Sequence, residues 1–234
     1  MTAPAFDPNT EPFNPSKVLS FDLETTSANP FEARIVTSAL VHIDSEGAHP
    51  RELLADPGVE IPEEATKVHG ITTERAREHG QPHEEVLATT VETIQQAWRD
   101  GYTLIVFNAA YDLTVLRQLT GNFVVDGPVY DPFVMDKALD PYRKGKRTLS
   151  DLCAEYNVRI DNAHEATSDA LAAARIAWVQ AKKRFSAEIS TKTLNELMEF
   201  QTVRYFELQT SFKNYLLGQG KNAETVNTSW PMQG

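Results

Sequence analysis

Phe21-Asp22-Leu23-Glu24-Thr25-Thr26 is the stretch on which the interpretation of the whole chain rests, and it ends an apolar run that begins at Val18. Successive side chains of an extended strand alternate between its two faces. Asp22 and Glu24 therefore point one way, and the apolar residues around them point the other way, toward a core. Two carboxylates side by side on a buried strand repel each other unless a cation lies between them. The stretch alone leaves two interpretations equally open, an acid pair on a solvated strand edge and a cation site.

The composition is that of a globular protein with one main domain. A chain of 234 residues can bury a sizeable core, and 41% hydrophobic and 24% charged residues are ordinary values. No apolar run is long enough to span a bilayer and no signal-peptide pattern opens the chain, so we expect a cytoplasmic protein. The single cysteine, Cys153, excludes an intramolecular disulfide and a zinc site of several thiolates.

The net charge of −11 limits how this protein can hold nucleic acid. A broad surface that coats DNA through its phosphates needs an excess of positive charge, which this chain lacks. The charge is compatible with a local site at which metal ions supply the positive charge.

Hydrophobic periodicity predicts strands first and then alternating strands and helices, which favours a mixed sheet with helices on both faces. Residues 1–16 are rich in proline and we expect a disordered or extended lead-in there. A first strand follows, with further elements predicted as strands at 34–44, 51–55 and 103–107 and helices at 84–99, 111–120, 148–156 and 166–185. Residues 62–83 are predicted to be a loop with short helical pieces, and the pattern at 129–139 is ambiguous.

The chain is divided by this pattern into a main domain at 17–185 and an extension at 186–234. Apolar residues keep helical spacing from Leu194 over many turns, which predicts one long amphipathic helix that ends near Gly218 or Gly220. We expect a loose tail after it, containing Trp230 and Pro231. Packing of the long helix on the domain is the favoured interpretation, and dimerisation or docking of a polymerase or clamp are the alternatives.

Two further acids lie on apolar helix faces. Asp112 shares the stripe of the apolar residues three, four and seven positions after it, and Asp169 has the same spacing to alanines and an isoleucine. Taken alone, Asp112 near a helix N-terminus fits a capping role. The many alanines around Asp169 give its helix a slim surface that can lie close to a sheet, which would bring Asp169 against Asp22 and Glu24.

Four converging carboxylates without thiolates are typical of a site for a hard cation. Such oxygen ligands suit Mg²⁺ or Mn²⁺, and a pair of these ions can clamp the attacking and leaving oxygens of a phosphodiester. His164 lies in a polar stretch shortly before Asp169. A lone histidine in a loop is usually just solvated. Beside a metal site it would be the natural general base, because its side chain titrates near neutral pH.

These residues resemble the motifs of the DEDDh exonucleases, the family of the proofreading epsilon subunit of bacterial DNA polymerase III. The motifs occur in family order as Asp22-Leu23-Glu24-Thr25-Thr26, then Asn108-Ala109 with Tyr111-Asp112, then His164 and Asp169 with four residues between them. Val68-His69-Gly70-Ile71-Thr72 and the segment 144–149 are similar to further family segments. Each motif is weak alone, but the ordered set over residues 17–185 is specific.

The resemblance implies a ribonuclease-H-like α/β fold with a five-stranded mixed β-sheet flanked by helices, here with a C-terminal helical extension. It implies that Asp22, Glu24 and Asp169 hold one divalent ion and that Asp22 and Asp112, the latter through water, hold a second. His164 would deprotonate the attacking water. The implied activity is 3′–5′ exonuclease hydrolysis of single-stranded nucleic acid, with DNA favoured, that releases nucleoside 5′-monophosphates in replication proofreading or DNA repair.

The candidate substrate contacts are fewer and weaker. Thr25 would meet the terminal sugar and phosphate, and Asn108 and His69 are further candidates, with a structural loop role equally open for His69. Lys146 and Arg147, together with Arg143 and Lys144, form a basic loop that could provide a phosphate path. A merely solvated basic loop is an equally good interpretation.

Two alternatives to a DNA exonuclease remain open from the sequence. The same chemistry could act on RNA or short oligonucleotides, because a 2′-hydroxyl is sensed by the shape of a pocket rather than by a motif. A non-catalytic accessory protein that binds a DNA polymerase is the other alternative. The complete set of five site residues argues against it.

Overall fold

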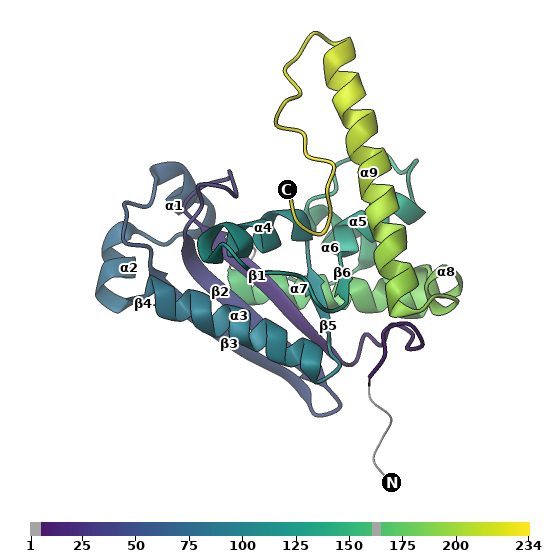
Figure 1. The fold of residues 1–234 in the computed structure, drawn as a ribbon, viewed down its shortest axis with the longest axis horizontal. Coiled ribbons are helices and arrows are strands. Elements are labelled where there is room, and N and C mark those ends of the chain that lie inside the picture. The colour runs from purple at the N-terminus through teal and green to yellow at the C-terminus, as the bar shows by residue number, and fades with distance from the viewer. Residues whose placement is uncertain (1–5, 161–164) are drawn as a thin grey trace.

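The computed structural model describes residues 6–160 and 165–234, and a six-stranded sheet in the order β4-β3-β2-β1-β5-β6 forms its centre (Figure 1). β1 (Val18–Thr25), β2 (Ile35–Asp44) and β3 (Gly47–Asp56) are antiparallel neighbours, whereas β5 (Thr103–Val106) and β6 (Val129–Tyr130) run parallel to β1. The predicted mixed sheet is confirmed. The predicted number of five strands is wrong, because the two-residue strand β4 (Gln81–Pro82) pairs with the end of β3 in a segment expected to be a loop.

The predicted helices are present, with small shifts at their ends, as α3 (His83–Arg99), α4 (Ala109–Thr120), α6 (Leu149–Tyr156), α7 (Ala166–Val179) and α9 (Leu194–Gly218). The short helical pieces expected in 62–83 are α1 (Glu63–His69) and α2 (Thr73–His79). Two further helices, α5 (Pro132–Leu139) and α8 (Ser186–Ser190), were not predicted. Helix α7 continues as the π-helix η1 (Gln180–Arg184). The ambiguous stretch 129–139 becomes β6 followed by α5, because Asp131 caps the helix and Pro132 is its first residue.

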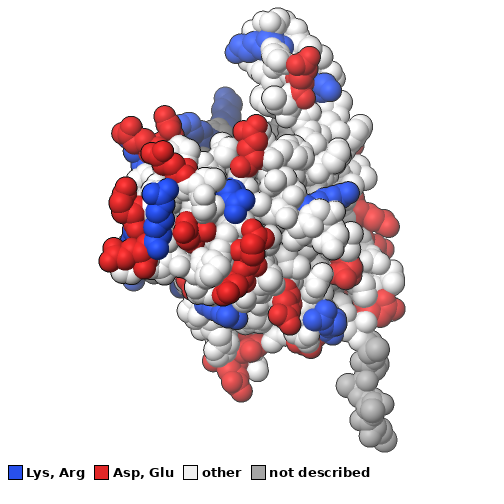
Figure 2. All heavy atoms as spheres, turned by 60° about the vertical axis from the view of Figure 1, so that its left-hand side comes forward, with Lys and Arg blue, Asp and Glu red and all other residues white. Residues whose placement is uncertain are grey.

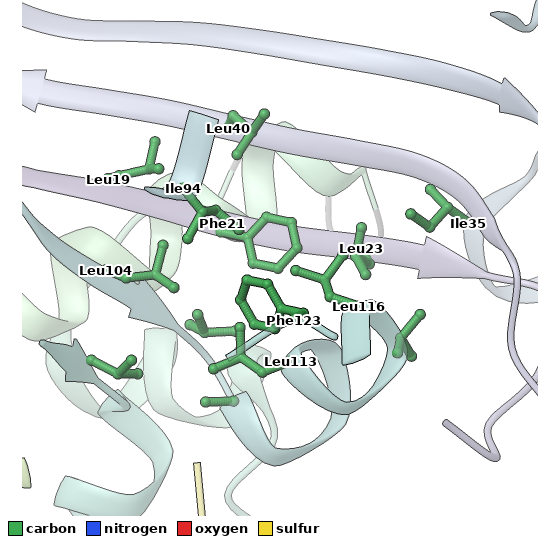
Figure 3. Close-up of a cluster of buried hydrophobic side chains, with 14 of the residues drawn as sticks. Leu19, Phe21, Leu23, Ile35, Leu40, Ile94, Leu104, Leu113, Leu116 and Phe123 are labelled. Atoms are coloured by element: carbon green, nitrogen blue, oxygen red, sulfur yellow. The ribbon is translucent and has the colours of Figure 1, made fainter. Parts of the chain in front are cut away.

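The two faces of β1 carry different side chains, as the alternation rule predicts. Leu19, Phe21 and Leu23 face helices α3 and α4, where Leu113 and Leu116 pack against them (Figure 3). Ser20 lies on the opposite face and donates a hydrogen bond to the backbone carbonyl of Ala170 at 2.6 Å, so α7 lies close to the sheet. The buried alanines of α7 make this close approach possible, and it places the acids of β1 between the sheet and α7.

Residues 6–16 and the C-terminal tail are packed more closely than the sequence predicts. Phe13 is buried and stacks on Tyr130 with ring centroids 4.3 Å apart, and Pro12 forms a β-bridge with Thr193. Residues 6–16 therefore lie against the domain. The expectation of a loose C-terminal tail is wrong, because Trp230 is buried in the same core as Phe21 and Leu23.

Helix α9 leaves the domain halfway along its length (Figure 1). Its buried residues lie in the first half, from Leu194 to Tyr205, and the second half exposes several large apolar side chains: Phe206, Phe212, Tyr215 and Leu217. The tail then folds back toward α4 (Figure 1). Among the helices of residues 6–160 and 165–234, none combines the length and the apolar character that crossing a membrane requires.

Candidate metal centre

Three of the four predicted acids lie close together in the structure. Asp22 and Glu24 from β1 and Asp169 from the first turn of α7 each place one carboxylate oxygen in a group whose members all lie within 4.8 Å of one another. The neighbouring strand β5 ends at Val106, opposite Phe21, so the acids lie just beyond its end. This position at the end of a parallel pair is open to ligands, while the rest of β1 stays inside the sheet.

Asp112 supports this group from the other side of β1. Its side chain is only 4% exposed, and its Oδ1 accepts a hydrogen bond from the backbone N–H of Leu23 at 3.1 Å. Asp112 is outside the group of three, yet its charge is close enough to raise the pKa of Asp22. The geometry thus places Asp112 next to the three acids but with one oxygen already engaged.

The electrostatics of the acids favour either protonation of the carboxyls or a cation between them. Burial raises the pKa of Asp22 well above its usual range, and the charges of Asp112, Glu24 and Asp169 raise it further. Burial, followed by the charges of Asp169 and Glu52, raises the pKa of Glu24 to about 7. A divalent ion among the carboxylates would reverse these effects. An all-oxygen donor set of this kind fits Mg²⁺ or Mn²⁺.

Asp131 is a residue of the site that sequence reasoning missed. Its carboxylate accepts hydrogen bonds from the backbone N–H groups of Asn108 and Ala109, at 3.0 and 2.9 Å, and so holds the start of α4. It also caps α5 and accepts the indole N–H of Trp230 at 3.3 Å. The sequence signal was the pair Asp131-Pro132, an N-cap followed by proline at the first helical position.

The start of α4 adopts a backbone conformation that needs this support. Asn108 has φ +64°, in the left-handed region that residues other than glycine seldom adopt. Its N–H bond to Asp131 stabilises that conformation. Because Asp112 lies in the first turn of α4, the position of Asp112 depends on Asp131.

Tyr111 and Thr25 join α4 to the end of β1. The hydroxyl of Tyr111 lies 2.5 Å from Oγ1 of Thr25 and also donates to the backbone carbonyl of Ser27. Burial raises the pKa of Tyr111 to about 12, so its hydroxyl stays protonated at neutral pH. The predicted substrate contact Thr25 is therefore held rigidly beside the acids.

His69 lies at the end of α1, and its Nδ1 accepts the N–H of Ile71 at 3.1 Å. Burial lowers the pKa of the ring, and a hydrogen bond to the backbone of Thr25 acts in the opposite direction. The neutral ring thus lies beside a cavity that Thr25 and Glu24 also line.

Two of the cavities beside the acids share part of their walls. One of about 500 Å³ is lined by residues that include Glu24, Thr25 and His69, and one of about 690 Å³ by residues that include Asp22, Asn108 and Asp112. Leu23 and Tyr111 belong to the walls of both. Asp22 and Glu24 therefore lie where the two cavities meet.

The basic loop is divided between structural and exposed side chains. The guanidinium of Arg147 is 8% exposed and binds the carboxylate and backbone carbonyl of Asp136, and Arg143 also pairs with Asp136. Lys146 is exposed and lines the larger cavity together with Lys137, a residue that the sequence did not single out. Arg147 lines that cavity as well, but its guanidinium already binds protein groups.

His164 lies outside the described residues. The part of the chain closest to it that the structure describes is the start of α7, where Glu165 precedes the helix and its carbonyl accepts the N–H of Asp169 at 3.0 Å. Positive charge elsewhere does not form a broad patch on the face in Figure 2, where acidic and basic side chains are mixed.

Comparison with known sequences gives one family and two relatives. The RNase_T family, described as "Exonuclease", matches residues 19–177. The chain is 26% identical over 181 residues to the DNA polymerase III PolC-type of Lacticaseibacillus paracasei and 27% identical over 162 residues to that of Listeria welshimeri. These matches cover 76% and 68% of the chain but only 12% and 11% of the relatives, so the chain spans a small part of their length.

Solved structures of exonucleases share the fold. Exonuclease I of Methylocaldum szegediense matches 72% of the chain and 41% of its own with a TM-score of 0.58 and 19% identity. Exonuclease I of E. coli in complex with a dT13 oligonucleotide matches 74% of the chain and 42% of its own, with a TM-score of 0.58 and 21% identity. Exonuclease X in complex with 5′ overhanging duplex DNA matches 74% of the chain and 98% of its own with a TM-score of 0.52. The predicted ribonuclease-H-like exonuclease fold is confirmed.

Proposed function

Because the chain belongs to the RNase_T family of exonucleases, we propose that it is a metal-dependent 3′–5′ exonuclease of single-stranded nucleic acid, with DNA as the favoured substrate. The observation that carries the proposal is the group of three carboxylates, of which Asp22 and Glu24 line two adjoining cavities. A scissile phosphate at this junction would have one nucleotide on either side of it.

Each acid has a role that follows from its position. Asp22, Glu24 and Asp169 would hold one divalent ion, and Asp22 with Asp112, through water, a second. Such ions supply positive charge to the attacking and leaving oxygens of the phosphodiester. Asp112 is suited to an indirect contact, because its Oδ1 already accepts the N–H of Leu23.

His164 is proposed as the general base on the strength of its place in the third motif. It would take a proton from the attacking water as the water oxygen bonds to phosphorus. The bond from phosphorus to the 3′ oxygen of the preceding nucleotide then breaks, and the terminal residue leaves as a nucleoside 5′-monophosphate.

The two cavities fit the two sides of the scissile bond. The smaller one, with Thr25 and His69 in its wall, suits the terminal nucleotide, and the larger one, with Asn108 and Lys146 in its wall, suits the nucleotide before it. Lys137 and Lys146 supply the local positive charge that the net charge of −11 does not. We assign Arg147 to holding the loop rather than to the phosphate, since its guanidinium binds Asp136.

The relatives suggest the setting. PolC-type polymerases carry a region similar to this chain, and exonuclease I has been solved with single-stranded oligodeoxynucleotides. A role in replication proofreading or DNA repair, alone or beside a polymerase that contacts α9, follows as part of the proposal.

One assay tests the activity and its direction. Single-stranded DNA and RNA labelled at the 5′ or the 3′ end are incubated with the protein and Mg²⁺, Mn²⁺ or EDTA. The proposal expects a ladder of shortened 5′-labelled products, nucleoside 5′-monophosphates from the 3′ end, and no reaction in EDTA. Asp22→Asn and His164→Ala should lose the activity, whereas Asp126→Asn, a matched change at an exposed acid, should keep it.

Inert wild-type protein with both metals and both substrates would contradict the proposal and favour a non-catalytic polymerase accessory. Shortening from the 5′ end would contradict the proposed 3′–5′ direction but not the exonuclease activity. Faster cleavage of RNA than of DNA would reverse the substrate preference.

A further inference from the structure

A third cavity lies outside the metal centre. It measures about 300 Å³ and is formed by α5 and the middle of α9, with Leu208, Gln209 and Phe212 on the α9 side. Its α5 side is formed by residues that include Phe133 and Lys137, which also line the larger of the two cavities at the acids. We call this third cavity the α5–α9 groove.

The three cavities form a row. The smaller and the larger cavity at the acids share Leu23 and Tyr111. The larger cavity and the α5–α9 groove share Phe133 and Lys137. A strand whose 3′ end lies beside Thr25 and whose scissile phosphate lies at the acids would reach Phe133 next. The groove is the continuation of that path away from the 3′ end.

The chemistry of the groove suits unpaired nucleotides. None of the residues that line it is acidic, in a chain whose net charge is −11. Lys137 lies at its entrance with Nζ 4.3 Å from the centre of the Phe133 ring, so a cation and an aromatic face stand together there. At the far end, Phe212 is 49% exposed. Aromatic faces that stack bases and lysines that meet phosphates are the two parts of a single-strand binding surface.

We propose that the α5–α9 groove binds the nucleotides upstream of the scissile bond, with Lys137 against the backbone and a base against Phe212. The proposal rests on the proposed function, because the 3′ end fixes the direction of the path. It assigns to the first exposed part of α9 a role in holding substrate. Paired bases cannot reach the ring of Phe212, so the occupant is single-stranded.

The length dependence of binding and cleavage tests the groove. Oligodeoxythymidylates from dinucleotide to dodecanucleotide, labelled at the 5′ end, are used to measure Kd in EDTA and kcat/KM in Mn²⁺. For wild type, both should improve with length until the groove is filled. Phe212→Ala should reduce the ratio of dodecanucleotide to dinucleotide kcat/KM by about fivefold or more, because stacking of a single base has that effect. The control is Phe206→Ala, a matched change on α9 at a side chain that is 54% exposed and does not line the groove.

Substitutions that add a positive or a negative charge at Gln209 should shift the Kd in opposite directions. Gln209→Lys should lower the Kd for the dodecanucleotide and Gln209→Glu should raise it, with both effects shrinking at high salt. A Phe212→Ala protein with the same length dependence as Phe206→Ala, or Gln209 variants that shift Kd in the same direction, would overturn the proposal and leave the groove to a protein partner.

The two proposals fail separately. Length-dependent binding that is sensitive to Phe212, in a protein that cleaves nothing, would support the groove and overturn the nuclease activity. Active cleavage without sensitivity to Phe212 would support the activity and overturn the groove.

Discussion

Asp22 and Glu24 are held on one face of a strand whose other face is buried in the core, so they cannot move apart to relieve their repulsion. Burial and the neighbouring acids raise the pKa of both. The folded protein without metal therefore keeps carboxyls that favour the protonated form. A cation relieves the repulsion, which couples metal binding to stability.

Asp22→Asn should lower kcat/KM on single-stranded DNA by more than about 100-fold, because even loss of an outer partner of a metal ligand lowers activity by about 10–100-fold. The same change should raise the Tm of the protein in EDTA, since it replaces a carboxyl whose charged form is disfavoured by burial and by the three neighbouring acids. Thermal unfolding in EDTA and steady-state kinetics in Mn²⁺ measure the two effects. A lower Tm would mean that Asp22 stabilises the metal-free fold.

Metal binding should depend on pH through Glu24. Its pKa is raised from 4.5 to about 7 in the folded state, so the metal-free protein keeps a proton that the unfolded chain has already released in this range. The stabilising effect of this proton on the metal-free protein is thus complete below the pKa of Glu24 in the unfolded chain, and it is lost as the pH rises through about 7. Because the ion binds the deprotonated carboxylate, the rise in Tm caused by Mn²⁺ should be larger at about pH 8 than at about pH 5.5. An equal rise at both values would contradict a role for Glu24 as a ligand.

Lys146 and Arg147 are neighbours in the chain, but we expect their substitution by alanine to affect different properties, nucleic-acid binding for Lys146 and stability for Arg147. Lys146→Ala should weaken binding of single-stranded DNA and reduce the slope of log K against log salt by about 0.7, the value for one phosphate contact, with unchanged unfolding. Lys221→Ala, a change of another exposed lysine after α9, is the control and should leave the slope unchanged.

Arg147→Ala should instead destabilise the fold by about 1.5–3 kcal/mol, because the buried carboxylate of Asp136 loses one of its two arginine partners and keeps only Arg143. Urea unfolding measures the loss. A salt slope that changes in Arg147→Ala as it does in Lys146→Ala would place both side chains on the phosphate path.

At the scale of elements, Asp131 is the point where α4, α5 and the C-terminal tail meet. One carboxylate holds the first N–H groups of α4, caps α5 and accepts the indole N–H of Trp230. Burial raises the pKa of Asp131 to about 6, while hydrogen bonds from Asn108 and Ala109 act in the opposite direction. The tail therefore contributes to the same residue that positions Asp112.

Trp230→Phe should remove the hydrogen bond and keep most of the buried volume. The expected loss of stability is about 1–3 kcal/mol, as for a buried polar group that loses a partner, and kcat should fall because α4 carries Asp112. Trp178→Phe is the control, since Trp178 is 39% exposed on α7. If Trp230→Phe unfolds at the same urea concentration as wild type, the tail does not stabilise Asp131.

For the whole molecule, the side-chain periodicity of single strands and helices was enough to predict that the acids lie close together. The alternation of β1 put Asp22 and Glu24 on one face, and the stripe of α7 put Asp169 inward; the structure brings these three together. The helices were predictable for the same reason, since each one carries its own periodicity and caps, such as the capping box of Thr148 with Asp151.

The contacts that sequence reasoning missed join residues far apart in the chain. Phe13 against Tyr130 and Trp230 against Asp131 each connect segments about a hundred residues apart, and no periodic pattern announces them. Both ends are rich in proline and glycine or lack periodicity, which is why they were interpreted as loose. The pairing of Arg147 with Asp136 was missed for a related reason, since a basic loop gives no sign of which side chain turns inward.

The claim on which the other inferences depend is that Asp22, Glu24 and Asp169 form a divalent-metal centre. Anomalous diffraction from crystals soaked in Mn²⁺ tests it most directly. We predict an anomalous peak in contact with carboxylate oxygens of all three residues, and its loss in crystals of Asp22→Asn grown and soaked in the same way. Crystals that take up Mn²⁺ only elsewhere, or show no peak at these acids at saturating Mn²⁺, would contradict the account.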